Sequence, residues 1–517
     1  MKTFFERLDE IVGIKSSAAR TPFFERAAYI FLCLTALSAP HSIAATQTSW
    51  LVGALFTAIW IIRARRVEWK FGLLDSAMIG LFAWSVVTSF TSYDPATSLD
   101  KLRGAAVFVI FYFAVFNLRT TRSVLFIAAL LIGSCMVNVV WVPIERMIGR
   151  GVEIHQTDPK GPLGGALLYD GDTLLTANKK PIRTPEDLAA ELQQSETVDV
   201  RFYRPDFEFT VKVNASAQLS GETAMERLGI GSWKKSRNWR SAGFYGHYTT
   251  YAEVLQLIGS LLLGFLVAGL SQWRRSASEA EQTKYSLWLP GLMIVSFALL
   301  LLALLFTVTR APQLGLLVSG AVIALFGLRG KWLYISALMI APFVIGGLLF
   351  LQQSRQVGFL DSKDESTRYR TVMLKDGIRI WTESPRNFLF GVGMDSVKKN
   401  WQEWGMFEGG KLPLGHFHST PIQLVVERGL PAILIWLIML YAYSGTLIRL
   451  LRSNAVLHWG ERGIVFGALG GLAGFVVSSL VHYNFGDQEV VMVFYLIMAL
   501  SIVTARLVQV SSSREPI

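Results

Sequence analysis

The sequence contains little charge and almost no cysteine. Only 17% of its 517 residues are charged while 52% are hydrophobic, and this balance excludes a soluble protein of this length. The two cysteines, Cys33 and Cys135, both lie within apolar segments, so they cannot build a zinc cluster and give little evidence for a disulfide. The chain is instead rich in aromatic residues, with 33 Phe and 15 Trp, as suits long interfacial belts in a membrane.

The sequence also offers little support for a cleaved signal peptide or for nucleic-acid binding. The N-terminus stays polar up to Arg26, and no small-residue cleavage site follows a short apolar core. The net charge of +11 comes mainly from Lys and Arg in short stretches between apolar runs, a distribution that encodes membrane topology. We therefore expect the first apolar run to remain as a helix, and we expect no nucleic acid among the partners.

Long apolar runs recur along the chain. A spanning helix needs about 20 apolar residues, because lipid offers no hydrogen-bond partner to an unpaired backbone group. The runs predict about twelve transmembrane helices, at 27–46, 49–62, 73–92, 104–118, 123–147, 249–270, 286–307, 311–327, 332–351, 429–447, 463–483 and 489–507. The predicted fold class is an all-α polytopic membrane protein.

The basic residues orient these helices. Alternate loops are rich in them: Arg63, Arg65, Arg66, Lys70, Arg119, Arg122, Arg274, Arg275, Lys284, Arg329, Lys331, Arg449, Arg452 and Arg462. The opposite short loops carry few. The positive-inside rule then predicts cytoplasmic termini and places two large polar segments, 148–248 and 352–428, outside.

Residues 149–215 predict a small α+β extracytoplasmic domain. Thr184-Pro-Glu-Asp187 reads as a capping box that opens a helix to about Gln194, and alternating apolar residues over 198–213 predict a hairpin. The order strand, helix, strand, strand resembles a PDZ domain of the bacterial envelope type, with Gly149-Arg-Gly-Val152 as the candidate carboxylate-binding loop. The resemblance implies a protein partner, and a spacer without a ligand is the alternative. None of the seven histidines is followed by Glu, so the zinc motif of an intramembrane metalloprotease is absent.

Four residues in the predicted outer part are suited to chemistry. Arg240 precedes the sixth predicted span, and Arg310 lies in the tight turn Thr307-Val-Thr-Arg310 between the seventh and the eighth. Arg370 lies upstream of Pro385 and a Gly-Val-Gly loop, and His418 lies just before the tenth span. An Arg presents a fixed fork of donors that matches phosphate oxygens, and a neutral His can accept a proton from an attacking hydroxyl.

Each of these residues also has a simpler interpretation. An Arg at a helix end commonly extends to the lipid headgroups, and a lone interfacial His commonly serves polar packing. His416 and His418 could form a metal pair, but no third ligand is nearby in sequence. The sequence therefore predicts no metal site and no cofactor.

The segment from Arg240 to about Leu440 resembles the O-antigen ligase and polymerase superfamily of bacterial envelope glycosyltransferases. In its ligases a His followed by Asn, Ser or Gln, then nine residues and Gly, marks the last large outer loop. His418-Ser419, the nine residues 420–428 and Gly429 fit that pattern. Arg240, Arg310 and Arg370 stand at the positions of its other recurring arginines.

The resemblance implies a GT-C-like helical fold and metal-independent, inverting transfer of a glycan from undecaprenyl diphosphate at the periplasmic face of the inner membrane. His418 would be the catalytic base, and Arg240, Arg310 and Arg370 would hold the diphosphate. The implied acceptor is lipid A core. Two alternatives within the superfamily are a repeat-unit polymerase with a glycan acceptor and a protein O-oligosaccharyltransferase. An alternative from another class is a transporter or flippase. Such a protein would have a two-fold internal repeat, and the two unlike outer loops do not favour one.

These expectations divide the chain into six parts. They are transmembrane helices one to five (1–148), the PDZ-like insert (149–215), a periplasmic connector (216–248), helices six to nine (249–351), the large periplasmic catalytic loop (352–428), and helices ten to twelve with the tail (429–517).

Overall fold

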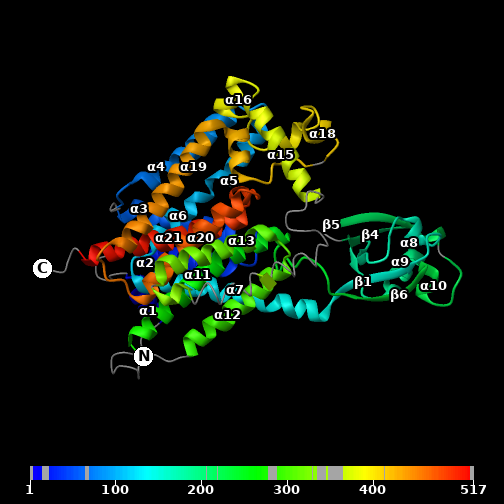
Figure 1. The fold of residues 1–517 in the computed structure, drawn as a ribbon, viewed down its shortest axis with the longest axis horizontal. Coiled ribbons are helices and arrows are strands. Elements are labelled where there is room, and N and C mark those ends of the chain that lie inside the picture. Colours follow the sequence, from blue (N-terminus) through cyan, green and yellow to red (C-terminus); the bar gives the residue numbers. More distant parts are fainter. Residues whose placement is uncertain are drawn as a thin grey trace. The chain divides into compact units, whose positions relative to one another are not determined.

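The computed structural model describes residues 4–13, 22–64, 69–204, 207–217, 219–276, 288–328, 330–334, 345–346, 365–412 and 414–512. The chain separates into two units, a helical unit of residues 1–138 and 244–517 and a smaller unit of residues 139–243. Figure 1 shows the helices of the first and the strands of the second.

The helical unit holds most of the apolar runs. Its helices are α1 (Phe4–Val12), α2 (Pro22–Ser38), α3 (Ile43–Ala64), α4 (Leu73–Phe90), α5 (Pro95–Ala105), η1 (Ala106–Phe108), α6 (Val109–Asn117), most of α7 (Thr121–Ile148), α11 (Tyr248–Ser276), α12 (Trp288–Phe306), α13 (Arg310–Gly327), α15 (Glu365–Thr382), α16 (Pro385–Phe390), α17 (Ser396–Asn400), α18 (Met406–Gly410), α19 (Thr420–Arg452), α20 (Trp459–Ser479), η3 (Asn484–Gly486) and α21 (Gln488–Ser512).

Nine of the helices in the described part are long and apolar enough to cross a membrane, namely α3, α4, α7, α11, α12, α13, α19, α20 and α21. This finding agrees with a polytopic membrane protein. Three of the twelve predicted spans are not among the nine. The first is the 17-residue α2, the fourth is divided between η1 and α6, and the ninth (332–351) lies almost wholly outside the described residues.

The centre of the helical unit is the packing of α11 and α13 against α20. Glycines allow these backbones to approach closely, as is common between membrane helices. Gly264 faces Gly463 and Gly467, and Gly315 faces Gly474. Because α20 runs antiparallel to both partners, the beginnings of α11 and α13 meet the end of α20.

The segment before α19 has its own apolar core. Met373 and Ile380 on α15 pack with Phe407, Phe417 and Val426, which come from α18, the loop before α19 and α19 itself. This core fixes the loop that carries His418 between α15 and the first turn of α19.

Two glycines allow this segment to lie against α19. Gly391 (φ 73°, ψ −172°) and Gly429 (φ 72°, ψ −176°) both adopt a backbone conformation that is essentially restricted to glycine. A Cβ at Gly429 would overlap the carbonyl oxygen of Leu389, and one at Gly391 would overlap the backbone nitrogen of Arg428. The glycine loop and the glycine that ends the His418 motif therefore pack on each other.

The smaller unit is built on one antiparallel sheet. Its strands are β1 (Arg150–Thr157), β2 (Thr173–Ala177), β3 (Lys180–Pro181), β4 (Thr197–Arg204), β5 (Phe207–Asn214) and β6 (Ile230–Ser236), and its short helices are α8 (Pro162–Gly165), α9 (Pro185–Gln194), η2 (Ala215–Ala217) and α10 (Ala224–Leu228). The strand order is β5-β4-β2-β1-β6, with β3 paired to β2. The predicted hairpin over 198–213 is present as β4 and β5.

The predicted capping box is present as well. The carboxylate of Asp187 accepts a hydrogen bond from the backbone N–H of Thr184 at 3.0 Å, at the start of α9. The sheet extends further than the sequence indicates, since β6 lies in the segment 216–248 that we expect to be a connector. It pairs with β1 from Arg150 to Thr157, so the candidate loop 149–152 largely belongs to a paired strand.

Candidate functional site

His418 lies in the loop directly before α19. Its backbone is left-handed, with φ 46°, a conformation that costs energy for a residue with a side chain and that is concentrated at functional sites. The next turn is anchored, because Thr420 donates its backbone N–H to the carbonyl oxygen of His482 at 3.1 Å. The loop and the start of α19 are thereby tied to the segment between α20 and α21.

A cluster of basic side chains surrounds His418. The imidazole rings of His416 and His418 meet edge to face, with their centroids 3.9 Å apart. Burial, together with the positive charges of His416, His482, Arg370 and His247, lowers the pKa of His418 from 6.5 to about 3. At neutral pH His418 is therefore a neutral imidazole near the permanent positive charge of Arg370, able to accept a proton.

A buried carboxylate supports this cluster. Glu253, on the second turn of α11, is 1% exposed, and its Oε1 lies 2.8 Å from Nδ1 of His482. Ser478 donates its hydroxyl to the same oxygen. Asn484 accepts a hydrogen bond from the Thr420 hydroxyl at 3.0 Å. The beginning of α11, the end of α20 and the beginning of α19 are thus joined by hydrogen bonds at one end of the bundle.

Arg310 is the first residue of α13 and lies at that same end. The contact of Gly315 with Gly474 sets the register of α13 on α20, and it places the start of α13 beside the end of α20. Val308, two residues earlier, has φ 51°, which is a genuine outlier for a β-branched residue. Two of the three candidate motifs in this unit therefore contain a strained backbone residue, which is Val308 near Arg310 and His418 itself.

Three of the four candidates belong to the helical unit, and one belongs to the smaller unit. His418 and Arg370, on α15, interact electrostatically, and Arg310 shares their end of the helical unit. Arg240 follows β6 and belongs to the smaller unit, where its neighbour Trp239 accepts a hydrogen bond from Arg146 through the backbone carbonyl.

Among the described residues, no group of three or more His, Cys, Asp or Glu side chains is placed to hold a metal ion. His416 and His418 contact each other through an edge-to-face ring arrangement. The chemistry that this part of the molecule offers is a neutral base beside fixed positive charge. That combination suits the removal of a proton from a hydroxyl next to an anionic leaving group.

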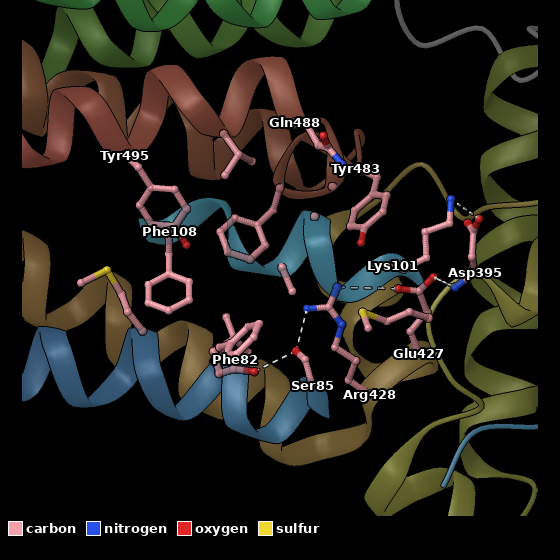
Figure 2. A pocket seen from close by; sticks show the side chains of 18 residues that line it. Phe82, Ser85, Lys101, Phe108, Asp395, Glu427, Arg428, Tyr483, Gln488 and Tyr495 are labelled. Atoms are coloured by element: carbon pink, nitrogen blue, oxygen red, sulfur yellow. Dashed lines mark hydrogen bonds and ion pairs between the residues drawn. The ribbon is translucent and has the colours of Figure 1, made fainter. Parts of the chain in front are cut away.

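A polar pocket lies on the other side of η3, within the helical unit. Figure 2 shows Ser85 of α4, Lys101 of α5 and Arg428 of α19 around it, together with Asp395 and Tyr483. The η3 segment separates the surroundings of His418 from the pocket. On one side, His482 and Asn484 form hydrogen bonds with Glu253 and Thr420. On the other side, the pocket is lined by Tyr483, Phe485 and Gly486.

The geometry agrees with a sequence comparison. Residues 295–437 match the family model of the O-antigen ligase. The O-antigen ligase match includes Arg310, Arg370 and His418, and it leaves Arg240 and the smaller unit outside. It supports the O-antigen ligase superfamily and, at a coarse level, a membrane enzyme of the glycosyltransferase type. A search of the curated proteins finds none that matches the chain.

Sequence reasoning missed Glu253, His482 and Asn484. A sequence signal was available for Glu253 alone. Glu253 is a carboxylate inside an otherwise apolar run, and such residues commonly mark functional sites in membrane helices. His482 lies in a short loop that follows a glycine-rich span, so its approach to His418 depends on tertiary packing.

Proposed function

We propose that the protein is an O-antigen ligase-like glycosyltransferase that moves a glycan from undecaprenyl diphosphate to an acceptor hydroxyl, with inversion and without a metal ion. The observation that carries this proposal is the neutral His418 beside Arg370 at one end of the bundle, within the O-antigen ligase match. In this proposal the site faces the periplasm, the protein resides in the bacterial inner membrane and both termini lie in the cytoplasm.

His418 is the general base in this mechanism. It removes the proton of the acceptor hydroxyl as that oxygen attacks the anomeric carbon of the donor sugar, and the bond from that carbon to the diphosphate oxygen breaks. Arg310 and Arg370 hold the departing diphosphate through charge-assisted hydrogen bonds. Arg240 is a further candidate ligand of the diphosphate, proposed on its sequence position alone.

The low pKa of His418 has a function in this scheme. Burial, and after it the basic neighbours, keep the imidazole neutral in the free enzyme, so its ring nitrogen is free to accept a proton. A bound diphosphate adds negative charge beside Arg370 and raises the pKa of His418 toward the operating pH, where a general base is most effective. The donor thereby activates the base.

The smaller unit favours a second candidate acceptor, a protein. The unit has its own buried core and an open sheet whose outer strands are β5 and β6, and peptides commonly bind such edges by strand addition. We propose that this PDZ-like unit docks a protein partner. Transfer to a purified periplasmic protein, and not to lipid A core, would favour this candidate, while extension of a lipid-linked repeat unit would favour a polymerase.

Single-turnover transfer from a labelled undecaprenyl diphosphate glycan to lipid A core tests the main proposal, with donor binding measured separately. His418→Ala should lower the rate by about 10²–10⁴-fold and spare donor binding, because the base acts only as the bond forms. Arg310→Ala should weaken donor binding as well, and Arg310→Lys should rescue only partly because it loses the planar fork. Full activity of His418→Ala would refute the mechanism.

A further inference from the structure

The pocket beside η3 has no part in the mechanism above. Its volume is about 170 Å³, and α4, α5, α19, η3 and α21 supply its lining. Ligand pockets for whole small molecules commonly measure about 300–1,000 Å³, so this pocket can hold one ring or headgroup of a larger molecule.

The charges in the pocket are balanced. Nζ of Lys101 lies 2.9 Å from Oδ2 of Asp395, and the guanidinium of Arg428 lies 4.0 Å from Oε2 of Glu427. Two cations and two carboxylates leave no formal net charge. This differs from the cationic surroundings of His418, and it argues against a phosphate or diphosphate as the occupant.

The buried part of the pocket contains a hydrogen-bond donor that is available for a further hydrogen bond. Arg428 is only 7% exposed, and among the described residues its Nε has no hydrogen-bond partner. Its Nη1 donates to the hydroxyl of Ser85 at 3.3 Å, and both side chains line the pocket (Figure 2). A buried donor of this kind carries a cost unless a ligand or water satisfies it.

Aromatic side chains complete much of the lining. Phe82, Phe108 and Tyr495 line the pocket on the side away from Lys101 and Asp395, and Tyr483 lies between the two sides (Figure 2). A ring with hydroxyls on its edge and C–H groups on its faces would pack its faces on the aromatic rings and form hydrogen bonds at its edge. The carboxylates would accept these hydrogen bonds, and Arg428 and Lys101 would donate them.

From this combination we infer that the pocket lined by Ser85, Lys101, Asp395, Glu427 and Arg428 is a binding subsite for a neutral pyranose ring. The inference deepens the proposed function and rests on it, since the ring would belong to the donor glycan or to the acceptor. Glycan units then have a recognition site separate from the residues that hold the diphosphate.

A hydrogen-bonded path links this subsite to the His418 loop. The backbone N–H of Phe417 donates to Oε1 of Gln423 at 3.0 Å, and Nε2 of Gln423 donates to Oε1 of Glu427 at 2.8 Å. The same carboxylate oxygen accepts the backbone N–H of Asp395 at 2.8 Å. Glu427, which lines the subsite, is thereby connected through Gln423 to the residue that precedes His418.

Gly104 provides a way to block the pocket. A Cβ at this helical glycine would meet only the end of the flexible Gln488 side chain, at 3.1 Å, so Gly104→Leu should extend into the pocket with little strain. Gly133→Leu is the matched control, because Gly133 is also helical and a Cβ added there would meet no atom within 4 Å among the described residues. Lys101→Met removes a donor at the rim, and Arg103→Met is its control on the same helix.

The experiment is saturation-transfer difference NMR on the full chain in a detergent without sugar groups. The probes are free glucose, galactose, mannose and N-acetylglucosamine, with inorganic phosphate as a competitor. We expect at least one sugar to bind the wild type, with affinity reduced by about tenfold or more in Gly104→Leu and Lys101→Met and unchanged in the two controls.

The outcomes separate the subsite from the proposed function. Binding of no sugar, binding that both pocket variants leave intact, or displacement of the sugar by phosphate would overturn the subsite, even if transfer activity is present. Sugar binding that Gly104→Leu abolishes would support the subsite even if the wild type transfers no glycan, and in that case the proposed function alone would fail.

Discussion

His416 and His418 touch through their imidazole rings, edge to face and with centroids 3.9 Å apart. Burial lowers the pKa of both, and the charge of His416 adds to the effect on His418. Protonation of one ring therefore disfavours protonation of the other. Burial, with the contribution of His416, keeps His418 neutral. Only His418 belongs to the motif that matches the ligase pattern.

This arrangement predicts different effects for the two histidines. His416→Ala should retain transfer activity, with a loss well below the about 10²–10⁴-fold loss expected for His418→Ala, because only His418 acts as the base. Single-turnover rates at saturating donor measure both. If His416→Ala is inactive while His418→Ala is active, the base is the other histidine.

The depressed pKa of His418 also predicts how the pH profile responds to Arg370. The free enzyme should show no acid limb from His418 in kcat/KM between about pH 5 and 8, because this pKa is about 3. Arg370→Gln removes a positive neighbour, so it should raise the pKa of His418 and move the acid limb of kcat/KM to higher pH. Arg379→Gln, on the exposed side of the same helix, is the control. An unchanged limb in Arg370→Gln would contradict the electrostatic link.

The same pKa predicts an effect on stability. The unfolded chain binds a proton at His418 near pH 6.5, whereas the folded chain does so only near pH 3. The contribution of neutral His418 to the free energy of unfolding is therefore fully present above about pH 6.5 and is lost as the pH falls toward 3. His418→Gln should lose less thermal stability than the wild type between about pH 7 and 5. An equal loss in both proteins, measured as Tm in detergent, would contradict this assignment.

The packing of Gly391 on Gly429 predicts that neither tolerates a side chain. Gly429→Ala and Gly391→Ala should each cost about 1–3 kcal/mol from the backbone conformation alone, and more from the overlap with neighbouring backbone atoms. Gly445→Ala is the control on α19, where the nearest atom is the end of the Arg449 side chain at 3.6 Å and where alanine favours a helix. Thermal unfolding in detergent provides the comparison, and equal Tm values for Gly429→Ala and Gly445→Ala would refute it.

The proposed mechanism also predicts that transfer needs no divalent metal. Arg310 and Arg370 would supply the positive charge that Mg²⁺ supplies in other transferases, so excess EDTA should leave the single-turnover rate unchanged. Mock-treated enzyme is the control. Loss of activity in EDTA that Mg²⁺ or Mn²⁺ restores would indicate a metal-dependent transferase.

The sequence by itself determined the features that depend on short-range pattern. The eleven predicted spans that fall on described residues all coincide with helices, because an apolar run in lipid must satisfy its backbone internally. The capped helix α9 and the hairpin β4–β5 were also readable, since caps and alternation are local signals. Motif spacing also predicted site roles for Arg310, Arg370 and His418, and these roles stay predictions.

Tertiary structure decided which of these residues meet. β6 joins the sheet by pairing with β1, which lies about eighty residues earlier in the chain. No local pattern in residues 216–248 predicts this pairing. Glu253 reaches His482 only because α11 packs beside α20. Side chains on separate helices have no fixed spacing in sequence, so the partner of the buried carboxylate and the balanced pocket became visible only through the packing of the helices.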